Sequence, residues 1–153
     1  MRLYSFTNYY LSSIQGGIQT AHVVHELFLK YPDHGQVERL AADDMLGLWA
    51  SNHKTIVVLN GGNSADLEAI AMLFDEDHNP YPWESFCEDE ASLNQASTCV
   101  GIVVPDLIYE TAEMVRKGSN LSLSDYAAMP MLSELTAFDW SLITLMNKCP
   151  LAR

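Results

Sequence analysis

The sequence predicts an α/β fold in one domain, with a four-stranded mixed β-sheet and helices packed on it. Segments with strand and helix patterns alternate along the chain, which is the order expected of such a sheet. The length of 153 residues suits one domain with a real core. A composition with 48% hydrophobic and 18% charged residues is typical of a folded chain and excludes a disordered one.

Four segments have the pattern of β-strands, over residues 3–10, 54–59, 81–87 and 97–104. The run at 54–59 is short and β-branched, which is typical of a central strand buried on both faces. Pro82 cannot donate to a sheet ladder, so it confines the third strand to an edge or to beginning after this residue. These four segments are expected to form the sheet.

Five segments have the periodicity of helices, over about residues 15–30, 37–50, 64–74, 107–116 and the stretch after Pro130. In the first helix the apolar positions are Ile14, Ile18, Ala21, His25 and Phe28. We expect this stripe to lie on the sheet, with His25 buried and bonded to a nearby carbonyl. The buried candidates of the second helix are Leu40, Met45, Leu48 and Trp49, and those of the last are Leu132, Leu135, Phe138, Leu142 and Met146.

The charge balance restricts the partners that this chain can bind. Twenty acidic residues against eight basic ones give a formal net charge of -12. Such a surface repels phosphate backbones and excludes a general nucleic-acid interface. A nucleotide ligand therefore requires a local exception.

Cysteine count and hydropathy indicate the compartment. Three cysteines form no regular disulfide framework, and residues 1–5 lack the pattern of a secretory signal. No apolar run approaches the roughly 20 residues of a membrane span. These features predict a reduced cytoplasmic protein with no membrane role.

Amide and imidazole side chains line one side of the first helix, at Gln15, Gln19, His22 and Glu26. His22 either faces a cleft beside Gln19 or is a solvated helix residue. The spacing of His22 and His25 matches neither zinc helix motif, so no metal site is predicted. Motifs for nucleotide cofactors are missing from the sequence, and no cofactor is expected.

Two loops follow predicted strands and offer further polar groups. Asn60-Gly61-Gly62-Asn63 lies between a strand and a helix, where open α/β sheets usually hold ligands. The same residues also suit an ordinary turn, with Asn63 capping the next helix. Glu88 is the first carboxylate after the third strand, and we favour it as a base or ligand acceptor.

These residues together resemble the type II peptidyl-tRNA hydrolase family. Residues 16–23, Gly-Gly-Ile-Gln-Thr-Ala-His-Val, are similar to its Gly-Lys-x-x-x-Gln-x-x-His-Ala phrase. Residues 54–59 resemble its Lys-x-Val strand, and 98–105 its Thr-hydrophobic-Gly-Pro strand. Glu88 takes the place of a loop aspartate, whereas Gln15 or Gly17 replaces the family lysine. These sequence motifs are also similar to those of small phage-encoded homologues.

The resemblance implies a peptidyl-tRNA hydrolase II-like α/β core over residues 1–105, and residues 106–153 then form a C-terminal helical extension of the same domain. It also implies a hydrolase that cleaves an ester or related bond of a nucleotide-containing substrate. Glu88 would deprotonate or orient water, and His22 would relay the proton. The substrate would be held by Gln15, Gln19, Lys54, Thr98 and the turn Asn60, Gly61, Gly62 and Asn63. The acidic surface disfavours tRNA and favours a small nucleotide or an aminoacyl or peptidyl ester.

Two alternatives stay open at this level. The cleft can bind or degrade a small nucleotide signal, such as a cyclic dinucleotide, or the fold can serve as a protein-interaction module. The last helix is expected either to pack on the sheet or to form a homo-oligomer, since an isolated apolar stripe would be left exposed.

Overall fold

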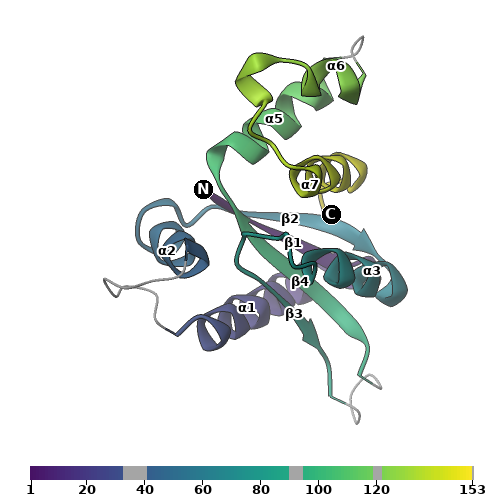
Figure 1. Ribbon diagram of the computed structural model, residues 1–153. Coiled ribbons are helices and arrows are strands. Elements are labelled where there is room, and N and C mark those ends of the chain that lie inside the picture. Colours follow the sequence, from purple (N-terminus) through teal and green to yellow (C-terminus); the bar gives the residue numbers. More distant parts are fainter. Residues whose placement is uncertain (33–40, 90–94, 119–121, 153) are drawn as a thin grey trace.

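The computed structural model describes residues 1–32, 41–89, 95–118 and 122–152, with the backbone alone for 41–44. Four strands form one mixed sheet: β1 (Arg2–Asn8), β2 (Ile56–Gly62), β3 (Trp83–Cys87) and β4 (Ser97–Val104). Their order is β2-β1-β4-β3, with β1 and β2 parallel and the other pairs antiparallel (Figure 1). The predicted α/β class and four-stranded mixed sheet are therefore confirmed.

The described residues form six α-helices: α1 (Ser13–Lys30), α2 (Ala41–Leu48), α3 (Ser64–Phe74), α5 (Asp106–Lys117), α6 (Leu123–Ala127) and α7 (Ala137–Lys148). A π-helical turn at Trp49–His53 and a 3-10 turn at Pro130–Leu132 complete the described elements. The caps follow the sequence signals, because Asn63 caps α3 with Asp66 and Gly118 follows α5. No helix in the described ranges is long and apolar enough to cross a membrane.

Helices cover both faces of the sheet, with α1 and α2 on one face and α3, α5 and α7 on the other. On the α1 face, Leu3 and Cys99 pack with Val23 of α1 and Leu46 of α2. On the α3 face, a larger cluster joins the sheet to α3, α5 and α7. Successive residues of β1 alternate between the two faces, as the pleat of a strand requires.

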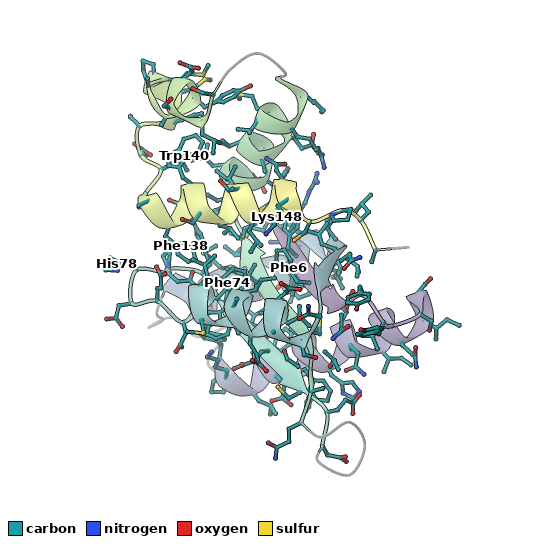
Figure 2. The ribbon with its side chains drawn as sticks, turned by 90° about the vertical axis from the view of Figure 1, so that its right-hand side faces the viewer. Phe6, Phe74, His78, Phe138, Trp140 and Lys148 are labelled. Carbon is teal, nitrogen blue, oxygen red and sulfur yellow. The ribbon has the colours of Figure 1, made fainter. Side chains whose placement is uncertain are left out.

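The α3 face is dominated by aromatic and branched aliphatic side chains. Phe6 and Phe74 meet edge to face, with ring centroids 5.9 Å apart. Figure 2 shows Phe138 of α7 directed toward this cluster from the helix that lies between the sheet and α5. The predicted stripe of the last helix thus packs on the chain's own core. The reason for expecting a homo-oligomer through this helix is therefore removed.

The β2 strand lies at an edge of the sheet, so the prediction of a central strand buried on both faces is wrong. The C-terminal segment pairs with part of its outer side. Asn60 donates its backbone N–H to the Pro150 carbonyl at 2.8 Å, and Ala152 donates to Val58 at 3.0 Å. Sequence alone could not reveal this partner, which is about 90 residues away along the chain.

The buried face of α1 also differs from the predicted stripe. The side chain of Ile14 is 78% exposed, and that of His25 lies in solvent, so the prediction of a buried His25 is wrong. The residues that face the sheet are Gly16, Gln19, Thr20, Val23 and Leu27. A Cβ atom at Gly101 would lie 2.5 Å from Val23 Cγ1. Because the helix approaches β4 so closely, its smaller side chains are the ones that fit.

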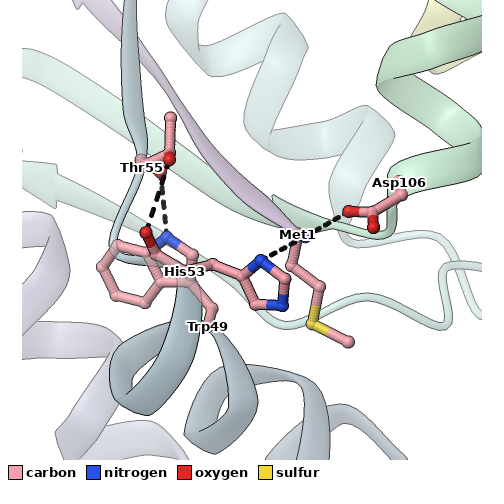
Figure 3. Close-up of polar contacts among 5 residues, drawn as sticks. All are labelled: Met1, Trp49, His53, Thr55 and Asp106. Atoms are coloured by element: carbon pink, nitrogen blue, oxygen red, sulfur yellow. Dashed lines mark hydrogen bonds and ion pairs between the residues drawn. The ribbon is translucent and has the colours of Figure 1, made fainter.

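The predicted second helix is described from Ala41 onward; Leu40 and the rest of 33–40 lie outside the described residues. Trp49 is buried and donates its indole N–H to the Thr55 carbonyl at 2.9 Å, whereas Leu48 is exposed and Met45 half-buried. Figure 3 shows this region, where the Met1 amino group also contacts His53 and Asp106. These contacts link the start of β1 to α5.

Candidate functional site

A chain of hydrogen bonds joins Gln19 of α1 to the ends of β3 and β4. The Gln19 amide donates from Nε2 to Glu88 Oε1 at 2.6 Å, and its Oε1 accepts from the Thr98 hydroxyl at 3.0 Å. Gln19 is almost fully buried and Glu88 is half-buried. A carboxylate only accepts hydrogen bonds, so the Gln19 amide must present Nε2 to Glu88, which leaves Oε1 to accept from Thr98. The Thr98 hydroxyl also lies 3.3 Å from the Phe86 carbonyl, and these bonds together hold the amide in one orientation.

The position of Thr98 depends on a β-bulge. Phe86 pairs with Cys99 and Cys87 pairs with Ser97, so Thr98 is an extra residue in β4. A bulge re-aims a side chain, and such bulges are common beside active sites. In a regular strand, Thr98 and Cys99 would point to opposite faces of the sheet. The bulge allows both side chains to face α1, so Thr98 reaches Gln19.

His22 lies one turn after Gln19 on the same helix. Its ring stacks on Phe86 with centroids 4.4 Å apart and an interplanar angle of 10°. This contact holds the imidazole beside the strand that carries Glu88, although His22 itself is exposed. Phe86 was not singled out in the sequence, where it could be recognised only as the residue two positions before Glu88.

The backbone of Glu88 is fixed as well as its carboxylate. The Glu88 N–H donates to the Ala96 carbonyl at 3.1 Å across the β3–β4 connection. In the part of the chain that the structure describes, no Lys or Arg forms an ion pair with Glu88. The site consequently combines one positioned carboxylate with neutral amide, hydroxyl and imidazole groups.

Beneath this site, Cys99, Ser5 and Thr20 form a chain of buried hydrogen bonds, here called the hydroxyl relay, in which each donor can be identified. Thr20 donates to the Gly16 carbonyl at 2.8 Å, so it must accept from Ser5 at 2.7 Å. Ser5 then accepts from the Cys99 thiol at 3.1 Å. Burial raises the pKa of Cys99 to about 11, which keeps the thiol protonated and unsuited to nucleophilic chemistry. This cluster supports α1 and takes no direct part in the site.

Two of the predicted substrate-binding residues lie elsewhere or have another role. Gln15 accepts from the backbone N–H and hydroxyl of Ser12, and so completes the capping box of α1. Lys54 is exposed at the start of β2, whereas the Asn60 turn lies at the end of this strand. The structure therefore brings Gln19, Glu88 and Thr98 together with His22 nearby, and it leaves Lys54 apart from them.

The Asn60 to Asn63 turn is held by its own hydrogen bonds. Asn60 Oδ1 accepts from the Gly62 N–H at 3.0 Å, and Asn63 caps α3. Gly62 has a φ of 95°, a conformation that favours glycine. Strand spacing places Asn60, paired with Thr7, roughly 10 Å from Thr98 across the sheet. Ser64, the residue after the turn, donates its hydroxyl to the Ser97 carbonyl at 3.1 Å, so the turn is linked to the start of β4 without contacting Gln19 or Glu88 in any described hydrogen bond.

A cavity of about 410 Å³ adjoins this turn. It is lined by Asn60, Gly61 and Gly62 of the turn, by Asp66, Ile70 and Leu73 of α3, and by Leu145, Lys148 and Cys149. A second cavity of about 350 Å³ lies beside it, and Asn60 and Pro150 line both. Burial raises the pKa of the Cys149 thiol, so Lys148 and Asp66 are the charged groups of the larger cavity.

No three His, Cys, Asp or Glu side chains gather as a metal-ligand set within the described ranges. A scan against models of protein families finds no match to this chain, and a search of curated proteins finds no similar sequence. The candidate site is therefore argued from its own chemistry.

Proposed function

We propose that the chain is a hydrolase of peptidyl-tRNA hydrolase type, acting on an ester or related bond of a nucleotide-containing substrate. The observation that carries this proposal is the 2.6 Å hydrogen bond from Gln19 to Glu88, with Gln19 oriented by Thr98. A carboxylate held in one orientation at a half-buried position is suited to act as a general base.

In this reaction Glu88 deprotonates a water that attacks the ester carbonyl carbon. The Gln19 amide has two N–H donors and uses one for Glu88, so the second can donate to the carbonyl oxygen as negative charge develops there. When the C–O bond to the ribose breaks, His22, on the same side of α1, relays the proton taken up by Glu88 to the departing oxygen. The stacked Phe86 ring keeps the imidazole in place for this step.

The charge of the chain favours a small substrate over tRNA. A net charge of -12 opposes approach of a polyanion, and no cation pairs with Glu88 among the described residues. A short nucleoside ester carries little charge and does not experience this repulsion. Neutral donors stabilise an oxyanion less than a lysine does, so a modest rate is expected.

The test is release of an N-acetylated amino acid from N-acetylaminoacyl-tRNA and from the corresponding 3′-adenosine ester. We expect faster turnover of the adenosine ester, and a loss of about 10²- to 10⁴-fold in Glu88→Gln. Glu68→Gln, an exposed change of equal charge on α3, is the control and keeps full activity. Release by the wild type that does not exceed release by Glu88→Gln would refute the proposal.

A second candidate function is binding of a small nucleotide signal without turnover. The observation in its favour is the 410 Å³ cavity beside Gly61 and Gly62, where Lys148 and Asp66 are the charged groups and Ile70 and Leu73 form an apolar wall. This combination suits a phosphate and a base.

Calorimetry with cyclic and linear dinucleotides tests this candidate. Ala69→Trp places a large side chain at the exposed wall of the cavity and should abolish binding, whereas Met72→Trp, on the same helix outside the cavity, should not. Equal binding by both variants would exclude the cavity as the binding site.

A further inference from the structure

A third cavity lies on the α3 face, opposite the face that carries Glu88. It is enclosed by β1, β2, α5, α7 and Leu151, and its volume is about 210 Å³. Val57, Leu59 and Met146 contribute apolar walls, and the polar walls come from Arg2, Glu113, Arg116 and Asn147. Its volume is below the 300 Å³ or so at which pockets begin to hold drug-sized ligands, so it suits a smaller molecule.

Positive charge is concentrated beside this cavity. The Glu113 carboxylate lies 3.9 Å from Arg2, 3.7 Å from Arg116 and 2.8 Å from Lys117. Lys117 and the two arginines hold the pKa of Glu113 below its usual value, so it is ionised at neutral pH. Of these groups, two arginines and one carboxylate line the cavity, so its lining carries a net charge of +1 in a chain whose net charge is -12.

A buried donor without an acceptor lies beside the cavity. Asn147 lines the cavity, and its Nδ2 is shielded from solvent and has no hydrogen-bond partner in the described part of the chain. Leaving a buried amide N–H unsatisfied is costly, and such groups usually find a partner. An oxyanion that draws this amide toward the cavity would supply the acceptor.

The Arg2 side chain is held in a position suited to binding an oxyanion. The Arg2 guanidinium lies 3.7 Å from the centroid of the Tyr109 ring, which fixes its plane. Burial raises the pKa of the nearby Tyr4 hydroxyl, so this group stays protonated and can donate. Planar guanidinium groups match carboxylate and phosphate oxygens with paired hydrogen bonds.

We propose that this cavity binds a small organic oxyanion, a carboxylate or phosphate on a short apolar body, held by Arg2, Arg116 and Asn147. The acidic group takes the hydrogen bonds, and the apolar body lies against Val57 and Met146. This site is independent of the reaction proposed for Glu88, because it lies on the other face of the sheet.

Calorimetry with benzoate, inorganic phosphate and neutral benzamide tests the proposal on the full chain. We expect binding of the anions and none of benzamide. Arg116→Gln should weaken anion binding about 10- to 100-fold, whereas Lys117→Gln should change it less than about threefold. Both residues contact Glu113 and both substitutions remove one charge, but only Arg116 lines the cavity. Absence of anion binding at millimolar concentrations, or equal loss in both variants, would overturn the proposal.

Asn147→Leu separates ligand binding from a structural role. Leucine has a similar shape without the unsatisfied amide, so the ligand-free protein should unfold at a higher urea midpoint and bind the anions more weakly. A lower midpoint together with unchanged anion affinity would show that the Asn147 amide serves the fold and would contradict the assignment.

Discussion

The two faces of the sheet are built from the same strands but packed in different ways. On the α3 face, large side chains such as Phe6 and Phe74 fill the space between sheet and helices. On the α1 face, Ser5, Thr20 and Gly101 allow the helix to come close, and buried hydroxyls bond to one another. The α3 face therefore depends on apolar volume, whereas the α1 face depends on close approach and hydrogen bonding.

This difference explains where the candidate site lies. A helix that packs closely on small residues can bring Gln19 within hydrogen-bond distance of two strands at once. Helices separated from a sheet by phenylalanine side chains cannot do so with a short polar side chain. The polar face thus carries the positioned carboxylate, and the apolar face provides most of the core.

The largest expected effect comes from removing volume on the α3 face. Phe74 is fully buried, with its ring centroid 5.9 Å from Phe6 and 6.1 Å from Trp83. Phe74→Ala should lower the free energy of unfolding by about 3–5 kcal/mol, measured by urea denaturation. Met72→Ala on the exposed side of the same helix should change it by less than about 0.5 kcal/mol. Similar losses of unfolding free energy in the two variants would contradict the conclusion that the α3 face depends on buried apolar volume.

The next effect comes from adding a methyl group on the α1 face. Gly101→Ala would place Cβ 2.5 Å from Val23 Cγ1 and should cost about 1–3 kcal/mol of unfolding free energy. The double variant with Val23→Ala should cost less than the sum of the single changes. Gly17→Ala, where a Cβ meets nothing within 4 Å, should instead stabilise by about 0.5–1 kcal/mol. Additive costs at Gly101 and Val23 would show that the helix is not closely packed there.

A smaller loss should follow from breaking the hydroxyl relay. Ser5→Ala removes the acceptor of the Cys99 thiol and the donor to Thr20, and we expect a cost of about 1–2 kcal/mol in urea denaturation. Ser141→Ala, an exposed helix residue that bonds only its own helix, is the control with little expected change. An unaltered unfolding free energy in Ser5→Ala would argue against the relay.

The smallest effect is a dependence of stability on alkaline pH. The pKa of Cys99 rises from 9.0 to about 11 on burial, so the unfolded chain loses this proton first. Stability from this group is complete below pH 9 and falls as pH rises toward 11, by about 1 kcal/mol at pH 10. Urea denaturation from pH 8 to pH 10 should therefore show a steeper loss in the wild type than in Cys99→Ala. Equal slopes would mean that Cys99 ionises as easily in the folded state.

Much of the local structure could be predicted from the sequence. Periodicity and Pro82 placed the strands and most helices near their observed ranges, including β3 at an edge. The resemblance also grouped Gln19, Glu88 and Thr98, whose hydrogen bonds the structure describes. The cavity with Arg2 and Arg116 left no sequence signal, because these residues are far apart along the chain.

The sequence by itself determined the strands and most of the helices, since propensity, caps and prolines act over a few residues, but the short helix α6 was not predicted. Only the tertiary structure decided which side of α1 is buried and whether β2 is central. The buried side of α1 depends on Gly101, about 70 residues beyond the end of the helix, because this glycine leaves room for Val23 while Ile14 stays in solvent. The position of β2 depends on the C-terminal segment, which pairs along the outer side of this strand. Both outcomes follow from contacts between distant segments, and hydrophobic periodicity within one segment carries no information about its partner.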